Sequence, residues 1–164
     1  MTPISICVIM KNEEKNMKAF LTSIKQAFQD YPHEIVLVDT GSTDQTLSIA
    51  QKYTDRIFHF EWIGDFSAAR NFSLSCAFND WVLVLDCDEY ITALDLSGLE
   101  AMIRQYPNAV GMLSRKNHYE QNGTDAVYTD DVERFFNRKA FHYEAIIHEQ
   151  VRANDGSDYI RAAI

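Results

Sequence analysis

Apolar residues along the first two thirds of the chain recur with two alternating periods. Nearly continuous apolar runs, typical of strands buried on both faces, lie at Ile4–Met10, Ile35–Val38, Ile57–Phe60 and Trp81–Leu85. Between them apolar residues return every three or four positions, which predicts helices over 17–28, 47–53, 66–76 and 99–106. Repeated strand–helix units of this kind predict a mostly parallel sheet with helices on both faces.

The pattern changes after Asn108. Short apolar segments, which we interpret as strands, lie at 110–113, 126–128, 133–136 and 146–151. Polar turns such as Gln121-Asn122-Gly123 separate them, so the last third predicts mixed sheet with long loops. The chain of 164 residues shows no repeat or linker, and we therefore expect one α/β domain.

Composition narrows the class of protein. With 46% hydrophobic and 24% charged residues, the chain has the makeup of a folded globular domain. Its net charge of −9 argues against binding nucleic acid through the phosphate backbone. The three cysteines form no C-x-x-C pair, which predicts neither a disulfide framework nor a zinc site and fits a reducing, cytoplasmic location.

Polar clusters follow three of the predicted strands. They are Lys11-Asn12-Glu13-Glu14, Asp39-Thr40-Gly41-Ser42 and Asp86-Cys87-Asp88-Glu89. Because ligands of open α/β sheets bind beyond the carboxyl ends of the strands, we expect these clusters to surround one site. Helix ends offer a simpler explanation for some members, since Ser42 and Ser97 each begin a capping-box pattern and acids favour the first turn of a helix.

Asp86 and Asp88 stand one residue apart, directly behind a buried strand. Two carboxylates there repel each other at low dielectric unless a positive charge lies between them. A divalent cation such as Mg²⁺ or Mn²⁺, which prefers oxygen ligands, supplies that charge and also takes phosphate oxygens. We interpret the pair as a metal site, with solvated loop acids as the alternative.

Two other segments carry candidate chemistry. Asp65 or Ser67 is suited to cap the start of a helix. Arg70 would then lie in the first turns of that helix, close to the edge of the sheet that carries the polar clusters. An arginine at that place is suited to bind an anion. A surface ion pair is the simpler role for this arginine. Late in the chain, His148 is a candidate to complete an ion site and Glu149 to act as a base, while a structural histidine remains an open alternative.

Together these segments resemble the glycosyltransferase family 2 proteins of the GT-A fold. Ile4–Glu14 is similar to the family's opening strand and N-E-E loop, and Val38–Thr46 to its V-D-x-G-S-T-D-x-T segment. Gly64–Asn71 and Trp81–Glu89 resemble the stretch that leads into its D-x-D motif. The resemblance spans nearly the whole chain and looks closest to the lipopolysaccharide-core glucosyltransferase-like branch, where these motifs occur with a late H-E.

The resemblance implies an enzyme, a metal-dependent inverting glycosyltransferase of the hexosyltransferase-like kind. It would move a sugar from a nucleotide-diphosphate sugar, a UDP-sugar first among them, to a saccharide, lipid-linked or protein acceptor. Residues 1–108 would bind the donor and residues 109–164 would begin the acceptor half. Cell-envelope polysaccharide synthesis and peripheral association with the cytoplasmic face of a membrane fit this reading. The chain is then either a short member or the catalytic half of a longer protein.

The same resemblance implies roles for residues on the donor side. Asp39 would accept a hydrogen bond from the uracil ring, and Asn12 and Glu14 would border the nucleoside. Arg70 would contact the base or the diphosphate. Asp86 would lie near the ribose and the metal, as a donor-binding residue and a metal ligand.

The metal and the catalytic base follow from the same resemblance. Asp88 would bind Mn²⁺ or Mg²⁺ bridging the diphosphate, and His148 would reach the metal or the diphosphate. Glu149 is the first candidate for the base. Asp130 and Asp131 compete with it, because they lie in the region that would face an acceptor.

Two alternatives stay open. The first is a nucleotide-sugar-binding module without transfer activity of its own. The second is an aspartyl-phosphate phosphatase of the haloacid dehalogenase type, which also has a D-x-D motif after a buried strand. That chemistry usually needs Thr or Val where Tyr90 stands, and its motif comes earlier in the fold.

Overall fold

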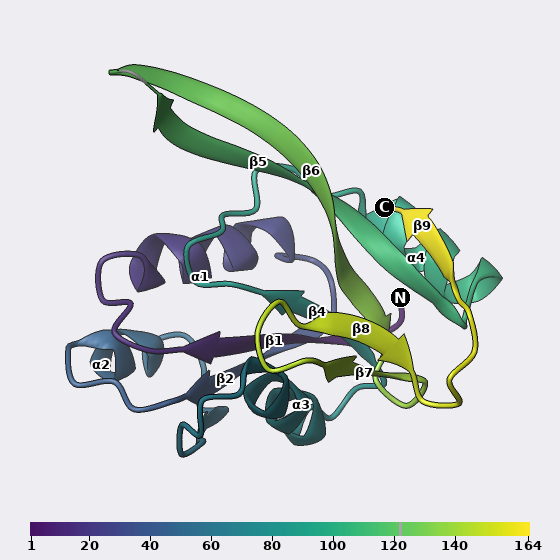
Figure 1. The fold of residues 1–164 in the computed structure, drawn as a ribbon, viewed down its shortest axis with the longest axis horizontal. Coiled ribbons are helices and arrows are strands. Elements are labelled where there is room, and N and C mark those ends of the chain that lie inside the picture. Colours follow the sequence, from purple (N-terminus) through teal and green to yellow (C-terminus); the bar gives the residue numbers. More distant parts are fainter. Residues whose placement is uncertain (122) are drawn as a thin grey trace.

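The computed structural model, which describes residues 1–121 and 123–164, has a seven-stranded sheet at its centre (Figure 1). Its strands are β1 (Ile4–Met10), β2 (His33–Asp39), β3 (Ile57–His59), β4 (Trp81–Leu85), β5 (Ala109–Gln121), β6 (Thr124–Asn137) and β9 (Ile160–Ala163). They lie in the order β3-β2-β1-β4-β6-β5-β9. The first four are parallel, β6 is antiparallel to both its neighbours, and β9 is parallel to β5. A separate hairpin joins β7 (Phe141–Glu144) to β8 (Gln150–Ala153).

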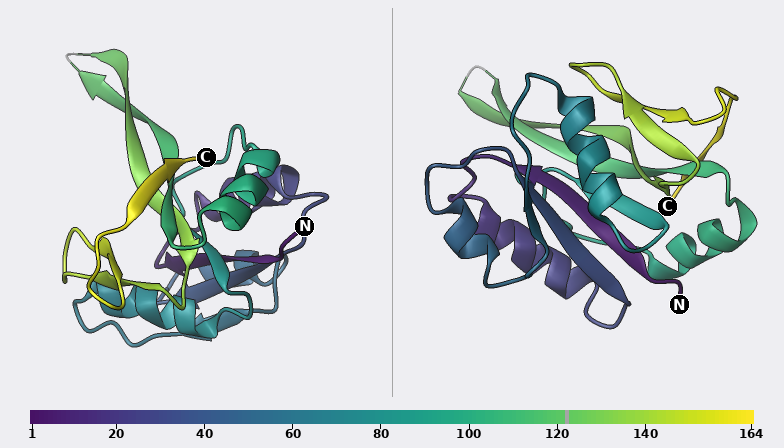
Figure 2. Two further views of the ribbon diagram at one scale, coloured as in Figure 1. Left: turned by 90° about the vertical axis from the view of Figure 1, so that its right-hand side faces the viewer. Right: turned by 90° about the horizontal axis from the view of Figure 1, so that it is seen from below.

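Helices cover both faces of the parallel strands, as the alternating pattern predicts. The helices are α1 (Met17–Ala27), α2 (Thr46–Ala50), α3 (Phe66–Cys76) and α4 (Leu96–Gln105). Alternate residues of β1 divide between two cores, with Ile6 in the core on the side of α1 and α4 and Cys7 in the core on the side of α3. The β7–β8 hairpin packs on the second face beside α3 (Figure 2). No helix in the described part of the chain is long and apolar enough to cross a membrane.

The C-terminal third differs from the short strands that we predicted. Segments 126–128 and 133–136 belong to one strand, β6, which pairs with β5 along most of its length. Much of this ribbon is exposed on both faces, so it lacks the apolar alternation that would reveal a strand. The predicted strand at 146–151 is wrong as far as Glu149, because β8 begins at Gln150. The predicted turn at Gln121-Asn122-Gly123 includes Asn122, which lies outside the described residues.

Two predicted capping boxes are replaced by other contacts. At the start of α2, Asp44 accepts a hydrogen bond of 2.9 Å from the Thr46 N–H, in place of a cap by Ser42. The first turn of α4 is capped by Asp95, which accepts from the N–H groups of Ser97 and the next residue. Aspartate caps as well as serine does, so spacing alone identified the wrong capping residue for α4; the N-cap residue of α2 is Gln45, whose side chain makes no cap hydrogen bond.

Phe135 ties the antiparallel half of the sheet to the parallel half. Its ring is fully buried and stacks on Trp81, with centroids 5.1 Å apart. We expect Phe135→Ala to lower the free energy of unfolding by about 3 to 5 kcal/mol, because it removes a large core side chain and leaves a cavity. The exposed change Val127→Ala on the same strand is the control and should cost less than about 0.5 kcal/mol. Equal losses in urea denaturation would contradict this account of the core.

Candidate active site

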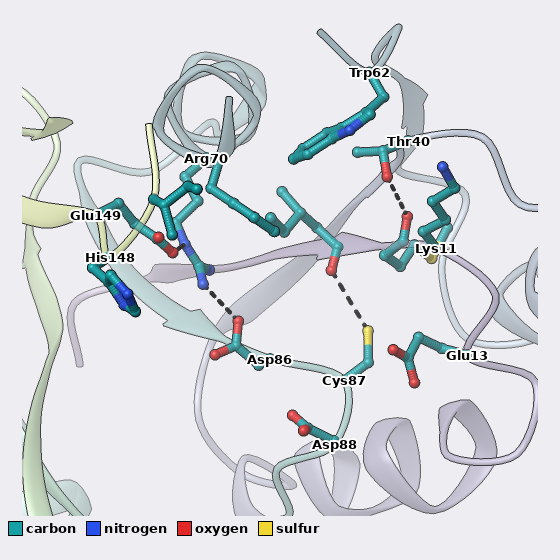
Figure 3. A pocket seen from close by; sticks show the side chains of 14 residues that line it. Lys11, Glu13, Thr40, Trp62, Arg70, Asp86, Cys87, Asp88, His148 and Glu149 are labelled. Carbon is teal, nitrogen blue, oxygen red and sulfur yellow. Dashed lines mark hydrogen bonds and ion pairs between the residues drawn. The ribbon is translucent and has the colours of Figure 1, made fainter. Parts of the chain in front are cut away.

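The carboxyl ends of β1, β2 and β4 meet at one edge of the sheet, where a cavity of about 650 Å³ opens (Figure 3). Residues that follow all three strands line it, together with the start of α3 and the segment before β8. Its polar and aromatic lining comprises Lys11, Glu13, Thr40, Trp62, Phe66, Arg70, Asp86, Asp88, His148 and Glu149. Residues of all three polar clusters therefore line one cavity.

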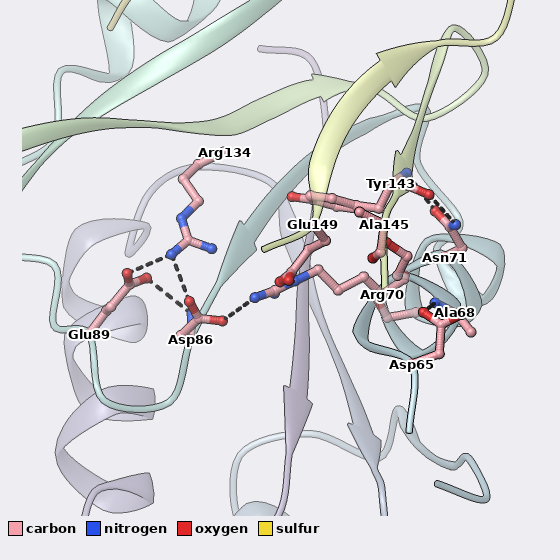
Figure 4. Close-up of polar contacts among 12 residues, drawn as sticks. Asp65, Ala68, Arg70, Asn71, Asp86, Glu89, Arg134, Tyr143, Ala145 and Glu149 are labelled. Carbon is pink, nitrogen blue, oxygen red and sulfur yellow. Dashed lines mark hydrogen bonds and ion pairs between the residues drawn. The ribbon is translucent and has the colours of Figure 1, made fainter. Parts of the chain in front are cut away.

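Two arginines hold Asp86 at the end of β4 (Figure 4). Arg70 Nη2 lies 2.8 Å from Asp86 Oδ1, and Arg134 Nη2 lies 2.7 Å from Asp86 Oδ2. Both arginines are only 7% exposed. The positive charge that the sequence argument assigned to a cation is thus supplied at Asp86 by two guanidinium groups.

Arg134 is a member of the site that sequence reasoning missed. It lies on β6, where the register with β5 shifts, since Glu133 pairs with Met112 and Phe135 with Gly111. An irregularity of this kind leaves one residue unpaired and re-aims its side chain. Arg134 also donates to Glu89 Oε1 at 2.6 Å. The one available signal was a charged residue directly before two consecutive phenylalanines in a predicted strand.

The two arginines lower the pKa of Asp86. Burial by itself raises the pKa of this carboxyl, but the charges and hydrogen bonds of Arg134 and Arg70 together outweigh burial and bring the pKa to about 2. Asp86 therefore stays ionised in the folded protein throughout the neutral range.

Arg70 joins Asp86 to the late segment of the chain. Its Nε donates to Glu149 Oε1 at 2.5 Å, while Nη2 contacts Asp86. The surface ion pair that we considered for Arg70 is wrong in one respect, because the side chain is buried. The guanidinium lies at the wall of the cavity between two carboxylates.

The other polar residues at the start of α3 bind the chain before Glu149. Asp65 caps the helix, as predicted, by accepting from the third residue of the first turn at 3.0 Å. Ser67 Oγ donates to the Ala145 carbonyl at 2.5 Å. Asn71 both donates to the Tyr143 carbonyl and accepts from the Tyr143 N–H, each at 2.8 Å. The segment D-F-S-x-x-R-N is therefore a docking surface for residues 143–149.

A tight backbone path carries His148 and Glu149 to the cavity. Ala145 has φ 80° and His148 has φ 57°, which is left-handed backbone that residues with a Cβ adopt at a cost. Between them, the Ile146 carbonyl accepts a hydrogen bond of 3.1 Å from the Phe66 N–H. Residues 146–149 are therefore not part of a strand, which begins only at Gln150, and both side chains lie at the cavity.

Asp88 presents an exposed carboxylate to the cavity. Within the described ranges, no three His, Cys, Asp or Glu side chains are grouped to hold a metal ion. The predicted ligands Asp86, Asp88 and His148 therefore do not form a preassembled three-residue group. One open carboxylate does fit Mg²⁺ or Mn²⁺, which keep several ligands for water and substrate phosphate.

Three residues predicted on the donor side lie next to the cavity lining. Asn12 and Glu14 accept backbone hydrogen bonds of 2.8 and 3.0 Å from the loop after β2. Asp39 is buried and accepts from two N–H groups of the same loop. These bonds order the two loops, and the adjacent residues Lys11, Glu13 and Thr40 line the cavity.

The three candidate bases lie in different places. Glu149 lines the cavity. Asp130 lies on β6 and accepts from Arg115 Nη2 at 2.6 Å and Asn117 Nδ2 at 2.7 Å. Asp131 is exposed, and because side chains alternate along a strand it faces away from Asp130.

In open α/β sheets, ligands bind in a cavity of this kind beyond the carboxyl ends of the parallel strands. The family model for glycosyl transferase family 2 matches residues 5–159. The chain belongs to this family, and the family and the GT-A fold that we predicted are confirmed.

Several relatives show how far the similarity extends. A TPR repeat-containing protein of Synechococcus elongatus is 32% identical over 151 residues, which are 92% of this chain and 36% of the relative. The poly(ribitol-phosphate) beta-N-acetylglucosaminyltransferase TarS of Staphylococcus aureus is 34% identical over 71% of this chain and 21% of its own length. The chain thus spans about a third or less of these curated relatives.

Solved structures agree with the family. TarS 1-349 of S. aureus in complex with UDP-GlcNAc superposes with a TM-score of 0.57 at 32% identity, over 76% of this chain and 36% of that one. The glucosyl-3-phosphoglycerate synthase of Mycobacterium tuberculosis, solved with Mn²⁺, UDP and phosphoglyceric acid, has a TM-score of 0.55 over 66% of this chain and 41% of that one. At 21% identity the latter shows the fold alone.

We expect ionised Asp86 to stabilise the folded protein at neutral pH and to lose this effect in acid. Its folded pKa of about 2 lies below the usual 3.8, so the contribution is present above about pH 4 and is lost as the pH falls toward 2. The difference corresponds to about 2 kcal/mol. Urea denaturation between pH 4.5 and 2.5 should show a shallower pH dependence for Asp86→Asn than for the wild type. Asp88→Asn, at an exposed carboxylate, is the matched control; equal slopes for Asp86→Asn and the wild type would contradict the prediction.

Proposed function

We propose that this domain binds a UDP-sugar in the cavity and transfers the sugar to an acceptor hydroxyl with the help of Mg²⁺ or Mn²⁺. The observation that carries the proposal is the convergence of Arg70, Asp86, Asp88 and Glu149 on one cavity in a family 2 chain. The similarity to TarS, solved with UDP-GlcNAc, supports a uridine nucleotide as the donor. Family membership removes the phosphatase alternative.

The donor would lie along the edge formed by β1, β2 and β4. The loops ordered by Asn12, Glu14 and Asp39 would border the nucleoside, as the resemblance implies, with Asp39 beside the uracil. Trp62 and Phe66 form an edge-to-face pair in the cavity wall, with centroids 4.8 Å apart, and offer an apolar surface to a ring. Residues 1–108 would then form the donor half and residues 109–164 the beginning of the acceptor half.

The cation would be held by Asp88 and by the donor diphosphate, with Asp86 and His148 close to it. When bound, the ion stabilises the negative charge that develops on the leaving diphosphate. Arg70 lies in the same wall and would act on the same charge, because a guanidinium suits phosphate oxygens.

Glu149 would be the base that takes the proton from the acceptor hydroxyl. The hydroxyl oxygen then bonds to the anomeric carbon while the sugar–diphosphate bond breaks, which inverts the configuration in one displacement. Glu149 is held by Arg70 at 2.5 Å, so it must first exchange this partner. The donor diphosphate is an anion that can take its place on the guanidinium.

Calorimetric titration with UDP, GDP and CMP, with and without Mn²⁺, tests the donor site. We expect UDP to bind in the presence of Mn²⁺, and Asp88→Ala to weaken this binding by at least about tenfold, because it removes the protein's open metal ligand. The matched control is Asp80→Ala, because this acid precedes β4, at the opposite end of the strand from Asp88, and pairs with Lys139. If a folded wild-type chain bound none of the nucleotides, the proposed site would be wrong.

Release of UDP from a UDP-sugar, to water or to an added acceptor, tests the assignment of the base. We expect Glu149→Gln to slow release by about 10²- to 10⁴-fold, the usual contribution of a general base. UDP binding should be retained. Asp131→Asn is the control, because this exposed carboxylate on β6 is not among the residues that line the cavity. A normal rate in Glu149→Gln together with a slow rate in Asp131→Asn would reverse the assignment.

A further inference from the structure

The outer part of β5 and β6 is a two-stranded ribbon that leaves the body of the protein. The two strands pair from Met112 and Glu133 out to Gln121 and Thr124. Pairing of β4 with β6 and of β9 with β5 is confined to the inner end. Figure 1 shows the ribbon rising from the sheet and projecting past α1. A long extension of this kind adds little to the core, which leaves its length unexplained by folding alone.

One face of the ribbon carries two exposed aromatic rings. Tyr119 is 43% exposed and Tyr128 is 52% exposed. Their rings meet edge to face, with centroids 5.8 Å apart. Tyr128 pairs across the strands with Asn117, two residues from Tyr119, so both rings lie on the same face. Large apolar groups gathered on a surface mark sites of interaction.

The same face carries planar polar side chains in fixed positions. Arg115 pairs across the strands with Asp130 and bonds it through two nitrogens, at 2.6 and 3.1 Å. Asn117 Nδ2 donates to the same carboxylate at 2.7 Å. We call the set Arg115, Asn117, Tyr119, Tyr128 and Asp130 the ribbon face. Its one arginine and one aspartate balance in charge, which suits an uncharged polar ligand.

The ribbon face is continuous with the candidate active site. Arg115 Nη1 lies 3.4 Å from Glu89 Oε1, and the same oxygen accepts from Arg134 at 2.6 Å. Arg134 in turn holds Asp86 at the cavity (Figure 4). A row of directly bonded side chains therefore runs from the cavity wall to the foot of the ribbon face.

We propose that the ribbon face binds a sugar or polyol unit of the acceptor, outside the unit whose hydroxyl reacts. Aromatic rings pack against the C–H faces of sugar rings, and planar amide, carboxylate and guanidinium groups bond to neighbouring hydroxyls. The ribbon face offers both kinds of group on one surface next to the donor cavity. This inference rests on the proposed function, because it names the substrate class that the transferase site would extend.

The test compares two double variants of the full chain. Tyr119→Ala with Tyr128→Ala removes both rings from the ribbon face. His118→Ala with Val127→Ala is the matched control, because these residues pair directly with each other, are exposed and point to the opposite side. Each protein is applied with UDP and Mn²⁺ to an array of mono- to hexasaccharides and uncharged polyols. UDP titration and light scattering are run on the same samples.

We expect the wild type and the control to be retained by the same members of the array. The tyrosine variant should lose at least about tenfold in affinity for them, or about 1.4 kcal/mol, while its affinity for UDP is unchanged. Unaltered retention of the tyrosine variant would overturn the inference. So would a wild type that binds UDP and no saccharide, or a dimer that the tyrosine changes convert to a monomer. Failure of the wild type to bind UDP would instead count against the proposed function.

Discussion

The contact of Arg70 with Asp86 and Glu149 holds the site together. One guanidinium joins three segments of the chain, namely α3, the end of β4 and the more distant segment before β8. Because the guanidinium is buried, it depends on both carboxylates, and leaving a buried charge without its partner costs about 3 to 5 kcal/mol. The three segments are therefore physically coupled, and the motifs D-F-S-x-x-R-N, D-x-D and H-E form one interacting unit.

Because of this coupling, some residues of these motifs have structural roles that do not require contact with a ligand. Asn71 and Ser67 hold the backbone of Tyr143 and Ala145, so their place in the motif is explained by docking without any contact to a ligand. Asp86 is likewise tied by two arginines, whereas Asp88 beside it is open to the cavity. Of the two acids in the D-x-D motif, one thus orders the wall and the other is available for chemistry.

The parallel half of the fold was predictable because its strands are buried on both faces and show up as continuous apolar runs, as in β1 and β4. The length of the ribbon of β5 and β6 was not predictable beyond short pieces, because neighbouring residues such as Val127 and Tyr128 are both exposed and leave no regular alternation of apolar and polar positions. The cavity followed from polar residues at strand ends. Arg134 could not be predicted as a site residue, because a local shift in strand register decides where its side chain points. No pattern of residue types in the sequence indicates that shift.

The charge at the cavity bears on how an anionic donor could be accommodated. Arg70 and Arg134 are both buried and already contact three carboxylates, those of Asp86, Glu89 and Glu149. These carboxylates thus neutralise the positive charge of both arginines, and the chain as a whole has a net charge of −9. Besides the exposed Lys11, a diphosphate entering this cavity gains positive charge in two ways, from an arginine that a carboxylate releases or from an additional cation. The proposed exchange at Glu149 and the proposed ion at Asp88 answer the same electrostatic requirement, and for this reason we assign them to one donor-binding event.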